Sequence, residues 1–343
     1  MAVPLVVHVA EYAGFVMSLI TNSLLLYLIA TKARKQFGAY KHIMLIFCCF
    51  GIGYSFVSIS AQPIYHSYKA SFVVMVGSWF QYDKTIGTIL ITLYCACFGM
   101  CLLLLALHFT YRYIAVCKPT LLYLFDGKKL IFSILIPFFF AANWYVAVYY
   151  MLEPNSNITN FNREAVKESY GEDLTRIAYI AALYYERDAE GNYHIYWDDI
   201  LCIVNLILIM GFSLSVIGFC GYRIHVEISA DDARFSKRTK ELHKQLFYVL
   251  IVQTAIPIIT MYTPVGSLFL LPFLEFKLGA LANSVPFYLA LYPSFDPLVA
   301  IILIRDFREA LLSGLRKRQQ KPDRYCTKQV IADSWVQPNH ISV

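Results

Sequence analysis

The chain has 343 residues, of which 58% are hydrophobic, 16% aromatic and only 15% charged. Soluble domains carry about 25% charged residues, so this composition excludes an ordinary soluble protein and indicates several membrane-spanning segments. The net charge of +6 would suit a nucleic-acid-binding protein, but the basic residues are spread over short loops on one side, which argues against nucleic acid as a partner.

Seven stretches without an acidic or basic side chain are long enough to cross a membrane as helices, which takes about 20 residues. They are 12–31, 42–68, 86–112, 130–152, 200–222, 245–274 and 278–304, the third ending in Arg112 and the last interrupted only by Asp296. Segment 70–82 is uncharged too, but it is too short to cross. No basic segment precedes the first stretch and no small-residue cleavage site follows it, so we expect a helix there and not a signal peptide. The sequence predicts an all-α membrane protein, a seven-transmembrane helix bundle.

The stretch Ile86–Arg112 is the one around which we expect the other helices to pack. No Asp, Glu, Lys or Arg occurs from Thr85 to Tyr111, and a helix of this length extends about 40 Å, more than the ~30 Å hydrocarbon layer. Arg112 then stands where the helix meets water. Such an arginine suits a contact with a partner on the cytosolic face, and a simple interfacial anchor is the alternative.

The loops on the two sides of the predicted bundle differ in their basic residues. Segments 31–41, 111–129, 223–245 and 305–343 hold 22 of the 29 Lys and Arg. Because basic loops remain in the cytoplasm, we expect the N-terminus outside and the C-terminus inside.

The segment 153–199 is the only large outer loop, with ten acidic and four basic residues. Asn162 with Glu164–Gly171 is expected to form a short capped helix. Tyr179–Glu186 and Asn192–Trp197 flank a Gly-containing turn, which predicts a hairpin. We interpret the loop as a lid over the mouth of the bundle, with a solvated linker as an equal alternative.

Cysteines and motifs favour a protein that is not an enzyme. All nine cysteines lie in predicted spans or on the cytoplasmic side, so we expect no disulfide framework, although Cys95 or Cys97 could meet Cys202. Cys97 and Cys101 share a helix face, but small apolar packing explains them better than a metal site. The motifs of metalloproteases, serine hydrolases, P-loops and dinucleotide-binding folds are absent, so we expect no catalytic residues, metal or cofactor.

The last span and the segment after it carry a second group of polar residues. Pro293 and Pro297 free backbone carbonyls and bend the helix, and Asp296 between them needs a partner inside the bundle. Residues 305–320 have one apolar and one basic face, which predicts an amphipathic eighth helix bound to lipid at the inner surface. We therefore expect one transmembrane domain over 1–320 and a disordered cytoplasmic tail over 321–343.

These residues carry a resemblance to a receptor class. Arg112 between two tyrosines resembles the Asp-Arg-Tyr end of the third helix of rhodopsin-like G-protein-coupled receptors. Asp296 to Phe307 resembles their Asn-Pro-x-x-Tyr-x6-Phe motif, and Asn22 fits their first-helix asparagine. The closer resemblance is to nematode seven-transmembrane chemoreceptors of the Str group, in the segments 94–98, 108–119, 244–247, 253–257, 292–298 and 305–308.

The resemblance implies a plasma-membrane receptor in the cilia of chemosensory neurons, which binds an odorant or pheromone and signals through a heterotrimeric G protein. Two positions depart from the rhodopsin-like pattern. Tyr111 stands where an acid usually holds the arginine, and Ala300 stands where a tyrosine takes part in activation. Glu241 could replace the acid, although several basic neighbours oppose this.

We expect ligand contacts in the outer half of the bundle and signalling contacts at its inner end. A small volatile ligand requires an apolar cavity with a few polar groups, for which the candidates are Tyr94, Asn205, Tyr262, Thr263 and Tyr288. Each of these alone is better explained by packing than by contact with a ligand. The candidates for G-protein coupling and activation are Arg112, Tyr113, Lys237, Arg238, Lys240, Pro293, Asp296 and Pro297.

Two other classes of sensory membrane protein remain as alternatives. A ligand-gated ion channel like the insect odorant receptors would have its N-terminus inside, against the distribution of basic loops. A small-molecule transporter would usually carry more ionisable groups at the midplane than Asp296, and an inverted repeat.

The sequon Asn157-Ile158-Thr159 provides a test of the predicted orientation. If the loop 153–199 is outside, Asn157→Gln removes one N-glycan and increases the gel mobility of the surface protein. Asn192→Gln, in the same loop but in no sequon, is the matched control and leaves the mobility unchanged. An Asn157→Gln protein that migrates like the unmutated one in glycosylating cells contradicts the orientation or the use of this sequon.

Overall fold

The computed structural model describes residues 5–32, 38–188, 190–229, 237–276 and 282–319. Within these residues seven helices are long and apolar enough to span a membrane, which confirms the predicted bundle. They are α1 (Leu5–Lys32), α2 (Tyr40–Ala61), α3 (Lys84–Cys117), α4 (Lys128–Met151), α6 (Trp197–Ser229), the helix from α7 (Lys237–Pro257) through η4 (Ile258–Tyr262) to α8 (Thr263–Leu270), and α9 (Ser284–Leu303).

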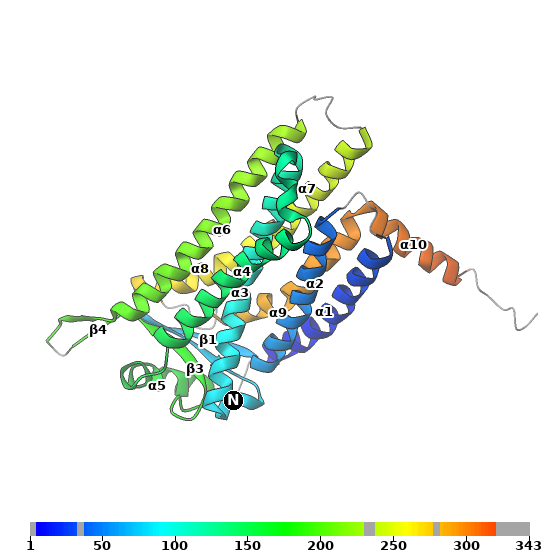
Figure 1. Cartoon of the computed structure of the whole chain (residues 1–343). Helices are drawn as coiled ribbons and strands as arrows, with labels where there is room; N and C mark the ends of the chain where they lie inside the picture. The colour runs from blue at the N-terminus through cyan, green and yellow to red at the C-terminus, as the bar shows by residue number, and fades with distance from the viewer. Residues whose placement is uncertain (1–4, 33–37, 189, 230–236, 277–281, 320–343) are drawn as a thin grey trace, which may run out of the picture.

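The third helix is the central one, as expected. Of the seven spans α3 is the most buried, since 72% of an 18-residue window of it lies inside the protein. It packs against α2, α4, α6 and α7. Figure 1 shows α3 running through the bundle, with a small sheet and α5 at one end and the helix α10 near the other. We call the first the sheet end and the second, to which the basic loops belong, the basic end. That the basic end is cytoplasmic remains a prediction.

A three-stranded antiparallel sheet closes the sheet end, and the sequence did not predict it. The strands β1 (Pro63–Tyr68), β2 (Ser71–Val76) and β3 (Tyr179–Leu183) lie in the order β1-β2-β3. The predicted second span, 42–68, was therefore too long, because α2 ends at Ala61. Gln62 has a left-handed φ of 44° and Pro63 cannot donate a backbone hydrogen bond, so the chain leaves the helix there.

The loop 153–199 is structured, and its predicted hairpin was partly wrong. Only β4 (Tyr185–Arg187) pairs with β5 (Tyr193–Ile195), around a turn at Asp188 and Gly191. The preceding strand β3 instead pairs with β2, over the register from Ser71 opposite Leu183 to Met75 opposite Tyr179. The loop is thus joined to the bundle by backbone hydrogen bonds and is not a solvated linker.

The helix α5 (Ser156–Tyr170) covers one face of this sheet. Its N-cap is Asn155, whose side chain accepts a hydrogen bond from the amide of Ile158 at 3.0 Å, and not the predicted Asn162. Asn162 is fully buried and donates to Ser71 Oγ at 2.9 Å, which ties α5 to β2. An ion pair of 2.7 Å joins Arg163 to the half-buried Asp173 in the following segment, and its hydrogen bond holds the pKa of Asp173 well below the usual value.

The helix α10 (Arg305–Gln319) follows α9 at the basic end and packs against α1 and α9. Phe307 is buried in this contact, whereas Leu312 is 50% exposed. Its position on a membrane surface remains a prediction, and the tail 321–343 lies outside the described residues.

Helix pairs come close where glycine leaves room. A Cβ atom added at Gly14 of α1 would lie 2.2 Å from the backbone oxygen of Ala290 in α9, so only glycine allows this approach. At Gly53 of α2, which is exposed, a Cβ atom would meet nothing within 4 Å.

We therefore expect Gly14→Ala to push α1 away from α9 and to destabilise the purified protein, by about 1–3 kcal/mol as is usual for overpacking. Gly53→Ala is the matched control and should keep or slightly raise the stability, because alanine favours helices. The measurement is the thermal unfolding midpoint in detergent. Equal midpoints for Gly14→Ala and the unmutated protein would show that the contact is not tight.

Candidate functional site

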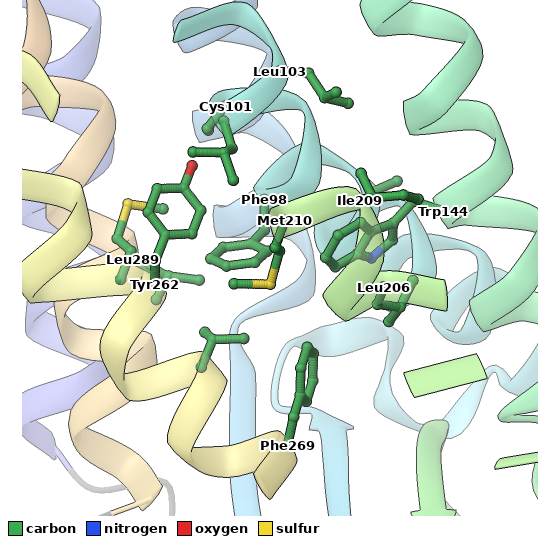
Figure 2. Close-up of a cluster of buried hydrophobic side chains, with 14 of the residues drawn as sticks. Phe98, Cys101, Leu103, Trp144, Leu206, Ile209, Met210, Tyr262, Phe269 and Leu289 are labelled. Atoms are coloured by element: carbon green, nitrogen blue, oxygen red, sulfur yellow. The ribbon is translucent and has the colours of Figure 1, made fainter. Parts of the chain in front are cut away.

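A narrow cavity lies below the sheet, between α3, α4, α6 and α8. The space inside it that a water-sized molecule can occupy is only about 30 Å³, so the lining side chains must move apart before a larger molecule can enter. The lining residues are Tyr65, Phe72, Val74, Cys95, Phe98, Trp144, Val148, Leu152, Ile180, Leu206, Val265, Leu268 and Phe269. We call this space the sheet-end cavity, and Figure 2 shows the side chains of Phe98, Trp144, Leu206 and Phe269 around it.

Aromatic contacts build the walls of the sheet-end cavity. The ring of Phe98 lies with its centroid 5.8 Å from Trp144 and 5.1 Å from Tyr262, and Phe72 of β2 lies 5.6 Å from Phe269 of α8. The polar side chains in the lining are limited to Tyr65, Cys95 and the indole N–H of Trp144. Such a cavity suits a small, largely apolar molecule.

The strands β2 and β3 form the roof of the cavity, and the segment after β3 fastens this roof to α8. Tyr184 donates a hydrogen bond to the backbone oxygen of Phe269 at 2.7 Å, and its ring stacks on Phe273 with centroids 3.9 Å apart. Tyr185 donates to the backbone oxygen of Phe273 at 3.1 Å. A ligand therefore reaches the cavity only when these contacts loosen or by a path between the helices.

The predicted ligand residues lie near the cavity but do not line it. Tyr94 and Tyr262 are buried, and their hydroxyls have no hydrogen-bonding partner among the described residues. Thr263 and Tyr288 are exposed on the outside of the bundle, and Asn205 bonds Asn143 of α4 at 3.0 Å, so these three residues do not line the sheet-end cavity, and their contact with a ligand remains a prediction.

Two residues that line the cavity are direct sequence neighbours of predicted ligand contacts. Cys95 and Leu206, each one residue after a predicted contact, line the cavity. Successive helix positions point about 100° apart, so these neighbours lie at the depth of the predicted contacts but on another face of each helix. Phe98 and Trp144 were missed because aromatic residues are common in every span of this chain.

A buried acid also escaped the sequence reasoning. Glu11 immediately precedes the predicted first span, 12–31, but α1 begins at Leu5 and Glu11 is 1% exposed. Ser58 of α2 donates a hydrogen bond to its Oε2 at 2.8 Å, while Oε1 has no partner among the described residues. The apolar residues before Glu11 were the available signal that the helix starts earlier.

At the basic end, Arg112 is enclosed by aromatic rings rather than by a carboxylate. It is 4% exposed, its guanidinium lies 4.1 Å from the ring centroid of Tyr40, and its Nη1 lies 3.5 Å from Nδ1 of His243 in α7. Its Nε and Nη2 have no hydrogen-bonding partner among the described residues. Glu241 is exposed and interacts with Arg305, so it does not replace the missing acid.

Tyr40 connects Arg112 to the rest of the basic end. Its hydroxyl lies 3.2 Å from Nδ1 of His108, and its ring stacks on Tyr111 with centroids 5.5 Å apart. The cation–π contact can stabilise a buried guanidinium by about 2 kcal/mol. Tyr111, which departs from the receptor pattern, thus supports the tyrosine that holds Arg112.

The proline segment of α9 is tied to α1. Pro297 cannot donate to the carbonyl of Pro293, and this freed oxygen accepts a hydrogen bond from Nδ2 of Asn22 at 2.9 Å. Asp296 is buried as predicted, but its carboxylate makes no hydrogen bond to a described residue. It faces a small cavity of about 20 Å³, mostly apolar, whose polar lining residues are Asn22, Tyr40, His108 and Gln253.

The remaining predicted signalling residues lie on α3 and α7. Tyr113 follows Arg112 and packs edge-on against Phe219 of α6, with ring centroids 5.7 Å apart. Lys237, Arg238 and Lys240 form the first turn of α7, on the helix that carries His243. The structure thus gathers Arg112 and the start of α7 at one end and the sheet-end cavity at the other.

Comparison with known proteins agrees with this arrangement. Residues 7–312 match the family described as serpentine type 7TM GPCR chemoreceptor Str. The chain is 35% identical over 317 residues, 91% of its own length and 92% of the relative's, to the Caenorhabditis briggsae protein "Serpentine receptor class r-10".

Two Caenorhabditis elegans proteins are also similar. The protein "Serpentine receptor class r-10" is 34% identical over 323 residues, 92% of this chain and 93% of the relative. The protein "G-protein coupled receptor str-33" is 29% identical over 306 residues, 88% of each. These relatives are receptors and not enzymes, and the seven spans make this chain a multi-pass membrane protein. Because the family match covers most of the chain, the protein belongs to the Str family of serpentine seven-transmembrane chemoreceptors.

Proposed function

We propose that this receptor binds a small, largely apolar odorant or pheromone in the sheet-end cavity and activates a heterotrimeric G protein at its basic end. Membership of a chemoreceptor family supports the plasma membrane, and specifically the cilia of chemosensory neurons, as its location. The observation that carries the proposal is the apolar cavity beneath β2 and β3. Apolar walls with few directing groups discriminate ligands mainly by size and shape.

The contacts between the cavity and α7 support a route for the signal. Phe98 in the cavity wall packs against Tyr262 in η4, a π-helical turn between Pro257 and Pro264. Prolines and π-turns weaken the helical hydrogen-bond ladder, so the helix can bend there. A ligand that displaces Phe98 therefore favours a different angle of α7.

The same helix carries His243 against Arg112. When α7 moves outward, Arg112 loses that neighbour and becomes accessible from the cytoplasm, as in other rigid-body switches. A guanidinium in such a cleft can donate hydrogen bonds to the carbonyls at the C-terminus of a helix of the G protein.

Two substitutions on α4 test whether the ligand binds in the sheet-end cavity, one that enlarges a side chain inside it and one that enlarges a side chain outside it. Val148 of α4 is 1% exposed and lines the cavity, whereas Val146 is 52% exposed on the outside. We expect Val148→Phe to raise the half-maximal odorant concentration at least about tenfold, because one poorly fitting group costs about 1–3 kcal/mol. Val146→Phe should leave it unchanged. The measurement is calcium imaging of expressing cells against an odorant panel.

A variant with a smaller side chain at the same position separates an effect on the cavity from misfolding of the Val148→Phe receptor. Val148→Ala should reach the surface and shift the preference toward longer ligands, because it enlarges the cavity. If both Val148 variants respond like the unmutated receptor at equal surface expression, the ligand binds elsewhere.

The coupling role of Arg112 is tested separately. Arg112→Ala should abolish most of the ligand-dependent signal at normal surface expression, and Arg112→Lys should keep part of it, because lysine retains the charge but not the planar donors. Ligand affinity without G protein should change little, since Arg112 is about 25 Å by helix rise from the outer half of α3. Full-amplitude signalling by Arg112→Ala would reduce Arg112 to an interfacial anchor.

A further inference from the structure

A second, larger cavity opens on the outside of the bundle near the basic end. It lies between α3, α4, α6 and the short helix η3 (Pro119–Phe125), and about 550 Å³ of it is open to a water-sized molecule. Its lining residues are Leu103, Ala106, Leu107, Thr110, Ile114, Leu124, Phe125, Lys129, Phe132, Ser133, Ile136, Pro137, Phe140, Phe212, Ser213 and Val216. We call it the α4 groove, and it is separate from both the sheet-end cavity and the surroundings of Arg112.

The walls of the α4 groove offer hydrocarbon and almost no free hydrogen-bonding group. Its three hydroxyls are already used within the protein: Thr110 donates to the backbone oxygen of Ala106 at 2.8 Å, Ser213 to Ile209 at 2.9 Å, and Ser133 to Leu124 at 3.3 Å. Phe132, Ile136 and Phe212 are 70%, 59% and 58% exposed. An occupant is therefore apolar over most of its length.

The exception is Lys129, at the end of the groove nearest the basic loops. Its ammonium lies 4.3 Å from the ring centroid of Tyr123, and no carboxylate among the described residues pairs with it. A cation at one end of a hydrocarbon groove complements a molecule with an anionic head and an apolar tail.

The length of the groove matches one leaflet of a bilayer. From Lys129 to Phe140 the helix α4 rises about 16 Å, close to half of the ~30 Å hydrocarbon layer. A peptide helix of this length would leave the polar groups of its inner backbone end in hydrocarbon, whereas an acyl chain has no polar group there.

We propose that the α4 groove binds an anionic phospholipid of the cytoplasmic leaflet, with one acyl chain between α4 and α6 and the phosphate at Lys129. The bound chain contacts Phe125, whose ring packs edge-on against Tyr111 with centroids 5.0 Å apart. Tyr111 stacks on Tyr40, which holds Arg112. Occupancy of the groove thus stabilises η3 and, through three aromatic contacts, the packing around Arg112.

The test is native mass spectrometry of the full-length receptor, reconstituted in vesicles of phosphatidylcholine and phosphatidylserine in equal amounts and released into detergent. The unmutated receptor should retain phosphatidylserine in preference to phosphatidylcholine. Lys129→Gln should lower this preference about fivefold, the usual effect of one basic residue at an anionic surface. Lys128→Gln, its neighbour outside the groove lining, is the matched control and should change it little.

A second variant tests the apolar part of the α4 groove independently of Lys129. Ser133→Trp fills the groove from its partly open side and should reduce the retention of both lipids, while free inorganic phosphate should not compete with phosphatidylserine. Equal retention of the two lipids by the unmutated receptor, equal losses in the two lysine variants, or full retention by Ser133→Trp would each overturn the proposal. A dimer that Ser133→Trp dissociates would also overturn it, because the groove would then bind a second copy of the chain.

Discussion

The constraint on which the whole structure depends is that a backbone polar group within hydrocarbon must find its partner inside the protein. A helix pairs its backbone N–H and C=O groups within one segment, which is why every span is helical. Where Pro297 breaks the pattern, Asn22 of another helix binds the freed carbonyl of Pro293, at 2.9 Å. The bend that the prolines introduce is thus also the point at which α1 and α9 are joined, beside the close approach at Gly14.

The same constraint explains where strands are allowed. The sheet of β1, β2 and β3 lies at the end of the bundle, where its edges can reach water, side chains or α5. In that position it closes the sheet-end cavity, and the hydrogen bond of Tyr184 to Phe269 couples this roof to α8. Backbone hydrogen bonds between the paired strands hold this roof together, which a free loop would lack.

At the basic end, aromatic rings take the place that an acid has in the rhodopsin-like pattern. The ring of Tyr40 holds Arg112 by a cation–π contact, and His243 approaches it from α7. These contacts leave Nε and Nη2 of Arg112 without a hydrogen-bonding partner among the described residues, so the guanidinium keeps donors for another partner. This suits a receptor that must switch, and it makes Tyr111 a support of Tyr40 rather than a defect.

The sequence by itself determined the class, the seven helices, the central place of Ile86–Arg112 and the family, because hydrocarbon thickness and the absence of charge act on each segment separately. Only the tertiary structure decided which face of each helix is inside. It moved the cavity lining from Asn205 to Leu206, buried Glu11, and paired β3 with β2, more than 100 residues earlier in the chain. These outcomes depend on contacts between distant segments, and an apolar residue that faces lipid looks the same in the sequence as one that faces the core.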